Sequence, residues 1–107
     1  MEPTETQVTD NRELGRFEIR AEGVVAYLEY TRGPSVIVLV HTEVPERLGG
    51  RGVAGRLARH AVELARRELL RVDLVCPFML GWIDRHPEHA DLLHGGSGAA
   101  LDDPFWF

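Results

Sequence analysis

Residues 36–54 read VIVLVHTEVPERLGGRGVA, and this stretch decides the fold because it joins a strand, a glycine-rich loop and a helix. The apolar run at residues 36–40 predicts a well-buried strand, which we place over residues 35–44. Residues 45–51 hold a proline, two glycines and charged side chains, which is typical of a loop. From residue 52 to residue 70, apolar side chains recur every three or four positions, which predicts an amphipathic helix.

The flanking sequence predicts the rest of the fold. Strands are expected at residues 16–21 and 24–31, and short turns at Glu22-Gly23 and Arg32-Gly33-Pro34 make the first three strands an antiparallel meander. After the helix come a strand at 71–76, a helix at 77–85 and a helical turn at 87–93. The unit over residues 35–76 is expected to be a right-handed parallel crossover. The fold class is therefore α/β (α+β), with a mixed sheet that is antiparallel first and parallel at its end.

The chain has 107 residues, which suits one domain. Residues 1–14 are polar, and we expect them to form a flexible N-terminal arm. Residues 15–94 make the domain, and residues 95–107 form a C-terminal tail. The tail ends in Phe105-Trp106-Phe107, which suggests a segment that docks on another surface.

Composition excludes several function classes. All 12 basic residues are arginine, against 17 acidic residues, for a net charge of −5. Without lysine there is no lysine Schiff base and no Walker phosphate loop. The acidic balance argues against a nucleic-acid partner, and no apolar run is long enough to predict a membrane span. A single cysteine, Cys76, and an acidic N-terminus unlike a targeting peptide suit the cytoplasm.

The loop before the long helix carries the most chemical information. Glycines let backbone N–H groups close on a ligand, and a helix N-terminus adds a positive field, so the pattern is typical of a phosphate site. Arg47 and Arg51 are placed to add charge. The same sequence also suits a capping loop with no ligand. The glycine spacing differs from the dinucleotide fingerprint.

The motifs around this loop resemble a known family. His41-Thr42-Glu43-Val44-Pro45 followed by Gly50-Arg51-Gly52-Val53-Ala54 is similar to motif A of the GNAT superfamily of N-acetyltransferases. Cys76-Pro77-Phe78, the later run IDRHPE at residues 83–88, Asn11 and Arg16-Phe17-Glu18 resemble the small, minimal GNAT-like family. The resemblance covers residues 10–93, and the combination is far more specific than any single motif.

This resemblance implies a GNAT-like acyl-CoA acyltransferase fold that binds acetyl-CoA as co-substrate, with no metal. The residues that it assigns to acetyl-CoA are Thr42, Glu43, Val44, Gly49, Gly50, Arg51, Gly52, Val53 and Ala54. When the GNAT motif is aligned on Gly52-Val53-Ala54, Gly49 stands where the superfamily has glutamine or arginine. A second alignment frame, which begins the motif at Arg47, also matches the residue types but shifts the helix start by two residues. We favour the first frame, in which backbone N–H groups do most of the phosphate binding.

Three side chains are candidates for catalysis: Cys76, His41 and Glu43. His41 and Glu43 lie two apart on a strand and therefore share a face. The resemblance implies that their strand bulges, splays from its neighbour and pairs with the pantetheine arm through the backbone at residues 42–44. Cys76 precedes the first turn of a helix, which favours a thiolate, although a lone cysteine is also commonly a buried hydrophobe. Either an amine attacks acetyl-CoA directly, with His41 or Glu43 as base, or Cys76 takes the acetyl group first.

Other side chains receive structural interpretations. We expect Phe78, Trp82 and Ile83 in the core, with Trp82 where many GNAT enzymes have an acidic tyrosine, a role that indole cannot fill. His60 is expected to be solvated. The histidines at 86, 89 and 94 are interpreted as surface residues rather than a metal site. The helix arginines are expected to face solvent with Glu63 and Glu68 as partners, although some are placed to meet the 3′-phosphate of CoA.

The function predicted from sequence is acetyl transfer to an amine, from a small molecule or a peptide, by a monomer or weak homodimer. The alternative is a CoA-binding module without efficient catalysis that acts in regulation or interaction. A third, weaker interpretation is a bare α/β domain whose loop binds no ligand.

Overall fold

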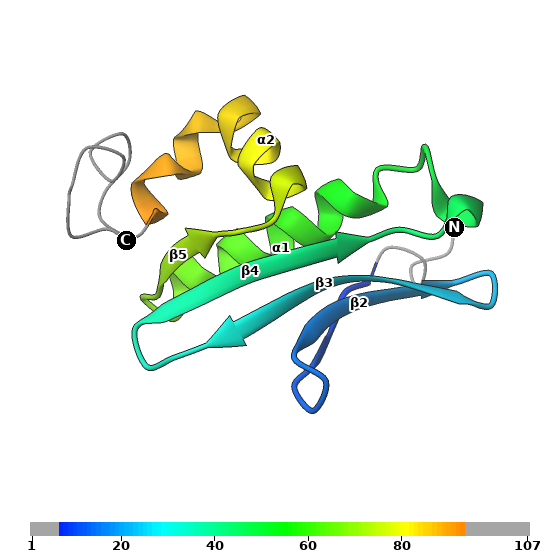
Figure 1. The fold of residues 1–107 in the computed structure, drawn as a ribbon, viewed down its shortest axis with the longest axis horizontal. Helices are drawn as coiled ribbons and strands as arrows, with labels where there is room; N and C mark the ends of the chain where they lie inside the picture. The colour runs from blue at the N-terminus through cyan, green and yellow to red at the C-terminus, as the bar shows by residue number, and fades with distance from the viewer. Residues whose placement is uncertain (1–6, 94–107) are drawn as a thin grey trace.

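The computed structural model describes residues 7–93 (Figure 1). Five strands form one sheet in the order β1-β2-β3-β4-β5, and the helices follow β4 and β5 along the chain. The strands are β1 (Thr9–Asn11), β2 (Arg16–Ala21), β3 (Val24–Arg32), β4 (Val36–Glu43) and β5 (Arg71–Leu74). The helical segments are η2 (Glu46–Leu48), α1 (Val53–Arg67), α2 (Pro77–Arg85) and η3 (Pro87–Leu92).

The first four strands pair antiparallel, which confirms the predicted meander. The turn between β2 and β3 has Glu22 at φ 53° and Gly23 at φ 79°. Two consecutive positive φ values are what a type I′ turn requires, and its twist matches that of the flanking strands. The turn therefore sets the register in which Phe17 pairs with Leu28, both of them fully buried.

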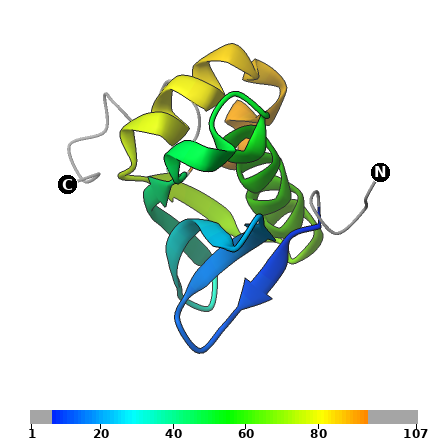
Figure 2. The same cartoon turned by 90° about the vertical axis from the view of Figure 1, so that its right-hand side faces the viewer.

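The β4–α1–β5 unit is the predicted parallel crossover, with Val36 to Leu39 pairing with Arg71 to Leu74. Helices α1 and α2 lie together on one face of the sheet (Figure 2). The apolar stripe of α1 packs on the inward side chains of the strands, so the core lies between the sheet and the helix layer. Its fully buried members include Phe17, Ile19, Leu28, Ile37, Leu39, Leu57, Val62 and Met79.

The structure differs from the sequence prediction at several boundaries: β5 ends at Leu74 rather than at residue 76, and residues 46–48 of the expected loop form η2. Two further differences concern the N-terminal arm and the end of α1. Thr9–Asn11 of the expected flexible arm form β1, because Thr9 pairs with Glu18 and Asn11 with Arg16 of β2. Helix α1 ends at Arg67 rather than at residue 70. Leu69 adopts φ 58°, and its N–H and that of Leu70 bond back to Arg66 and Ala65 in a Schellman motif. The apolar pattern continues past this end because Leu70 still packs into the core.

Two further expectations concern the ends of the chain and the membrane. The aromatic run Phe105-Trp106-Phe107 lies outside the described residues. Within residues 7–93 no helix combines the length and apolar character needed to cross a membrane.

Candidate functional site between helices α1 and α2

Strands β4 and β5 separate at the edge where both of them end. Their ladder stops at Leu39, whose carbonyl accepts hydrogen bonds from the N–H groups of Val75 (3.0 Å) and Cys76 (3.1 Å). Beyond this point β4 continues to Glu43, whereas the chain after β5 turns away into α2 (Figure 1). We call the resulting gap the β4–β5 splay. Past Leu39, β4 pairs within the described chain only with β3, so its other edge has free backbone donors and acceptors.

A β-bulge at the same position determines which way the side chains of β4 point. Tyr30 pairs with Leu39, but Glu29 pairs with His41, so Val40 is an extra residue in β4. A bulge reverses the alternation of the side chains beyond it. Thr42 therefore joins Leu39 on the face that carries the helices. His41 and Glu43 lie on the opposite, open face of the sheet.

The glycine loop (residues 49–52) leads into the start of α1, where backbone N–H groups have no helical acceptor. Gly50 (φ 78°) and Gly52 (φ 71°) are left-handed, a conformation that glycine adopts without the Cβ clash of other residues. Gly52 is the N-cap, with no side-chain capping hydrogen bond, and the first helical bond runs from Arg56 N–H to the Gly52 carbonyl. The amides ahead of Arg56 in α1 consequently have no helical acceptor, and the first turn contains no acidic residue.

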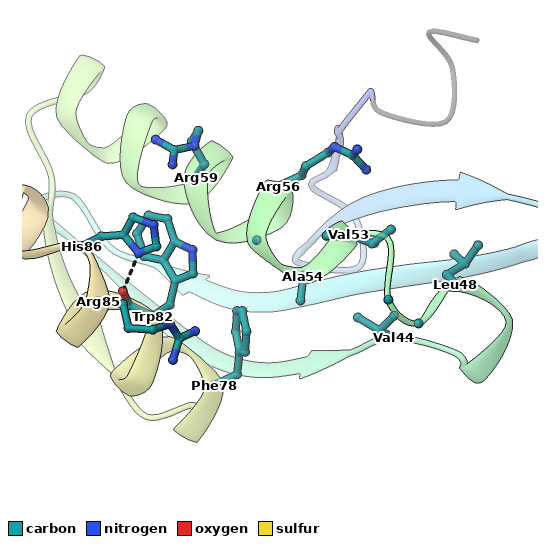
Figure 3. Close-up of a pocket in the computed structure, with 14 residues that line it drawn as sticks. Val44, Leu48, Val53, Ala54, Arg56, Arg59, Phe78, Trp82, Arg85 and His86 are labelled. Atoms are coloured by element: carbon teal, nitrogen blue, oxygen red, sulfur yellow. Dashed lines mark hydrogen bonds between the residues drawn. The ribbon is translucent and has the colours of Figure 1, made fainter. Parts of the chain in front are cut away.

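A cavity of about 660 Å³ lies between the glycine loop, α1 and α2, and we call it the α1–α2 cavity (Figure 3). Three arginines and, among the described residues, no aspartate or glutamate line it, a charge balance that suits a polyanionic ligand. Its lining comprises Val44, Leu48, Gly49, Gly50, Gly52, Val53, Ala54, Gly55, Arg56, Arg59, Phe78, Trp82, Arg85 and His86.

The structure brings six residues of the predicted acetyl-CoA set around this cavity and leaves three outside its lining. Those that line it are Val44, Gly49, Gly50, Gly52, Val53 and Ala54. Thr42 and Glu43 lie further back on β4, and Arg51 points to the β2–β3 turn, where it pairs with the Glu22 carboxylate. Arg47 donates to the backbone carbonyl of Glu22 at 3.1 Å. The side chains of Arg47 and Arg51, which were expected to add charge to the phosphate site, thus point toward the β2–β3 hairpin.

Cys76 lies beside the β4–β5 splay. It is the N-cap of α2, its side chain is buried, and its Sγ lies 3.1 Å from the Oγ1 of Thr42. This contact joins the two strands across the splay. Pro77 at the first helical position begins α2 here because its missing N–H costs the helix nothing and its φ is already helical.

His41 and Glu43 form a pair on the open face of the sheet. His41 Nε2 lies 3.0 Å from Glu43 Oε1, and both side chains are more than half exposed. The His41 ring lies 6.2 Å from that of Tyr27, which in turn carries the Arg16 guanidinium 4.4 Å above it. The structure confirms that His41 and Glu43 share a face, and it places them on the opposite side of the sheet from Cys76.

From the sequence, Phe78 and Trp82 were expected in the core, and Arg56, Arg59 and His86 on the solvated surface. Trp82 is buried as expected, yet its indole also lines the cavity together with Phe78. Arg59 is exposed as expected and also lines the cavity, and Glu68, one of its expected partners, pairs with Arg32 of β3 instead. The sequence signal for these cavity residues was their helical spacing. Residues 56 and 59 share one face of α1, and residues 78, 82 and 85 share one face of α2.

His60 and His86, which were expected to be solvated or on the surface, both pack against aromatic rings. His86 is no free surface residue, because its ring stacks on Trp82 at 3.9 Å and its Nδ1 lies 2.8 Å from the Trp82 carbonyl (Figure 3). His60 is half-buried against the edge of Phe17 at 5.0 Å, and burial, aided by Arg67, lowers its pKa below the usual value. Within residues 7–93 no group of three metal-ligating side chains converges, and His94 lies outside the described residues.

Comparisons with known proteins agree with this architecture. A family model described as GCN5-related N-acetyl-transferase matches residues 16–92. Protein NATD1 of Gallus gallus is 33% identical over 85 residues, which cover 76% of each chain. Protein NATD1 of Xenopus tropicalis is 32% identical over 92 residues, covering 81% of this chain and 84% of that protein.

A solved structure shares the fold. The solution structure of a GCN5-like protein from Staphylococcus aureus superposes with a TM-score of 0.66 at 24% identity, over 88% of this chain and 93% of that one. This match confirms the predicted mixed sheet and acyltransferase-type fold. The family model over residues 16–92 and the NATD1 matches establish that the chain belongs to the GCN5-related N-acetyltransferase family.

Proposed function

We propose that this protein is an acetyl-CoA-dependent N-acetyltransferase that transfers the acetyl group to an amine. One observation carries the proposal. The α1–α2 cavity combines unpaired amides at the start of α1 with three arginines and, among residues 7–93, no carboxylate, and it lies beside the β4–β5 splay. A ligand with several phosphates and a long polar arm fits this arrangement, and acetyl-CoA has both.

The chain's own groups suit the parts of such a donor. The amides of Val53 and Ala54 suit the pyrophosphate, because they are directed donors at a helix N-terminus and have no helical acceptor. The free edge of β4 beyond Leu39 suits the pantetheine arm, whose amides can add to the strand as another strand would. With the pyrophosphate at the start of α1 and the pantetheine arm along β4, the thioester would lie in the β4–β5 splay, beside Thr42 and Cys76.

The acceptor amine is proposed to approach from the open face, where His41 and Glu43 lie. In direct transfer, the amine nitrogen attacks the thioester carbonyl carbon, the carbon–sulfur bond breaks, and the proton lost by the amine passes to His41. Glu43, 3.0 Å from His41 Nε2, stabilises the imidazolium that forms. The departing CoA thiolate takes its proton from water, because the indole of Trp82 is a donor with no acidic proton to give.

Transfer through Cys76 is the second route compatible with this geometry. The Cys76 sulfur attacks the thioester, its proton passes to the departing CoA sulfur, and acetyl-Cys76 forms. The amine then attacks this second thioester, and the Cys76 thiol is restored. The Thr42 hydroxyl, 3.1 Å from the Cys76 sulfur, is placed to hold that sulfur in position.

Calorimetry with acetyl-CoA, followed by intact-mass measurement and assay against a panel of primary amines, tests the proposal. We expect micromolar binding, and turnover that falls in His41→Ala and Glu43→Gln while their acetyl-CoA affinity stays unchanged. No binding at high micromolar concentration would overturn the proposal. Binding with no turnover on any amine would identify a CoA-binding module instead.

The same experiment separates the two routes. A mass increase of one acetyl group that disappears in Cys76→Ala supports transfer through Cys76. Full turnover by Cys76→Ala supports direct attack. The chain has no lysine, so an adduct has few other positions on the protein, which makes the mass change easy to assign.

A further inference from the structure

The outer edge of β5, on the side away from β4, carries a single short pairing. Val72 pairs with Ile37 of β4 on one side and, in parallel, with Leu93 on the other. The Arg71 guanidinium donates to the Leu93 carbonyl at 2.6 Å and holds Leu93 in this position. Among residues 7–93 this bridge is the only strand pairing on the outer edge, so the edge beyond Val72 has free backbone donors and acceptors.

The parallel bridge also defines a direction along the sheet edge. A chain that continued from Leu93 parallel to β5 would pass toward Val75, at the end of β5 that is followed by α2 (Figure 1). Three residues of strand separate Val72 from Val75, which is about 10 Å. Residues 94–107 follow Leu93 and, at about 3.3 Å per extended residue, are long enough to cover that distance several times.

An exposed apolar patch lies at that end of β5. Val75 is 57% exposed and Leu80 is 53% exposed, and Pro77, also exposed, lies between them in the chain. The Leu80 N–H bonds to the Cys76 carbonyl at 3.1 Å, so Leu80 is one helical turn from the neighbour of Val75. We call Val75, Pro77 and Leu80 the α2-start patch. Apolar side chains that are exposed as a group, rather than singly, mark interaction surfaces.

The other two large apolar side chains exposed in the described chain are placed less well for the segment after Leu93. Leu69 precedes β5 and so lies at the end of the strand opposite to Val75. Leu14 lies between β1 and β2, at the far edge of the sheet. Each of them directly follows a glutamate in the chain, whereas residues 74–83 hold no acidic residue.

The sequence after Leu93 complements this patch in both apolar character and charge. Glycine and serine fill residues 95–98, which suits a connecting segment, and Asp102-Asp103 precede Phe105-Trp106-Phe107. Aromatic side chains gain the most from covering an apolar surface. Helix α2 has no acidic residue in its first turn and no side-chain cap, so its first N–H groups suit the two aspartates.

We propose that Phe105-Trp106-Phe107 docks on the α2-start patch of its own chain, with residues 94–98 as the connection along the outer edge of β5. The occupant is this segment rather than a second copy because the Val72–Leu93 bridge already holds the start of the connection at this edge. A short tether gives the attached segment an effective concentration that a separate molecule at micromolar concentration does not reach. The docking does not depend on acetyl-CoA binding.

NMR spectroscopy of the full chain tests the docking directly. We expect nuclear Overhauser contacts between the rings of residues 105–107 and the methyl groups of Val75 and Leu80. These methyl shifts should move when all three aromatic residues are replaced by alanine. The methyl groups of Leu14 and Leu69 are the control in the same spectra, because both side chains are exposed and should not move. Absence of the contacts, or equal shifts at all four residues, would overturn the docking.

Limited proteolysis of Leu80→Glu tests the patch from the other side. Chymotrypsin cleaves after aromatic residues, and cleavage follows the undocked fraction when docking is fast. A charge in the patch should therefore speed cleavage at Phe105 roughly tenfold, measured by intact mass. Leu69→Glu is the matched control, because it places the same charge at an exposed leucine outside the patch and should leave the rate unchanged. An unchanged rate in Leu80→Glu, or the same increase in Leu69→Glu, would contradict the proposal.

A mixed sample separates docking within one chain from exchange between two copies. Equal amounts of ¹³C-labelled and unlabelled protein are combined, and contacts between labelled methyl groups and unlabelled rings are recorded. Such contacts would show that a second copy supplies the aromatic residues, which would overturn docking within the chain. Contacts confined to one chain and independent of protein concentration support it. No sample contains acetyl-CoA, so failure of the proposed function would leave these results unaffected.

Discussion

Thr42 Oγ1 lies 3.1 Å from Cys76 Sγ and links the two strands across the β4–β5 splay. The contact depends on the bulge at Val40, which turns Thr42 to the helix face, and on the end of β5, which places Cys76 at the N-cap of α2. A threonine hydroxyl so placed can donate to the cysteine sulfur when that sulfur is negative, and charge-assisted hydrogen bonds are the stronger ones.

Replacing Thr42 by valine should slow the alkylation of Cys76. The substitution removes the donor and keeps the shape, so we expect a roughly tenfold slower reaction with iodoacetamide at pH 7.5. Thr42→Ser keeps the hydroxyl and serves as the control. The rate is followed by intact mass, which is simple because Cys76 is the single cysteine. An unchanged rate in Thr42→Val would show that the hydroxyl does not donate to the sulfur.

Alanine at Gly52 should destabilise the protein. Gly52 lies at φ 71°, where an L-residue costs about 1–2 kcal/mol, and relaxing that strain would redirect the amides of the glycine loop. Thermal unfolding should therefore show a lower melting temperature, and calorimetry a weaker affinity for acetyl-CoA. Gly55→Ala is the contrast for stability, because Gly55 lies within α1, where alanine is favoured by about 1 kcal/mol. A wild-type melting temperature for Gly52→Ala would contradict the expectation.

Arg56 should matter more than Arg51 for binding acetyl-CoA. Arg56 lines the α1–α2 cavity, whereas Arg51 is paired with Glu22. We expect Arg56→Gln to weaken the affinity about tenfold and Arg51→Gln to weaken it by less than threefold, as for a surface pair. Isothermal titration at two salt concentrations measures both. The reverse order would mean that Arg51 leaves Glu22 when the ligand binds.

Glu18 is a buried carboxylate whose loss should be costly. Its side chain is 1% exposed, on the face of β2 that carries Arg16 and Arg20, and Asn11 donates to it at 3.1 Å. Burial alone would raise the pKa of Glu18, but the hydrogen bonds from Arg16 and Asn11, with the two arginine charges, outweigh it and lower the pKa. We expect Glu18→Gln to lose about 2 kcal/mol at pH 7, measured by urea unfolding.

The lowered pKa of Glu18 also predicts a pH dependence. The unfolded state binds its proton first as the pH falls, so the stabilisation is fully present above the unfolded value of about 4.3 and is lost as the pH drops through the folded value. Wild type should therefore lose stability below pH 5 more steeply than Glu18→Gln. Parallel curves for the two proteins would rule out this linkage.

His60 should make the fold less stable in mild acid. Burial against Phe17, together with the Arg67 charge, lowers the pKa of His60 in the folded state, so the unfolded state takes up the proton first. The free energy of unfolding should fall as the pH drops below about 6.5, the ordinary value for histidine. His60→Gln removes the titrating group. If the slope between pH 7 and pH 5 is the same in His60→Gln, the dependence comes from another residue.

The sequence by itself determined the order and type of the elements. Period-two runs gave the strands, the three- and four-residue spacing gave α1, and the glycines before Val53 marked its start. These signals are local, because they follow from which face of each element is buried. The resemblance to the GNAT motifs extended them to a fold, which the structural match confirms.

The tertiary structure decided what the site contains. The bulge at Val40 comes from the pairing of β4 with β3, so the local periodicity of residues 36–44 carries no trace of it. Arg51 and Glu22 meet because the β2–β3 turn lies beside the glycine loop. Arg59 and Trp82 meet because α1 and α2 pack on one sheet face, so long-range contacts bring together the helical faces that spacing along each helix defines.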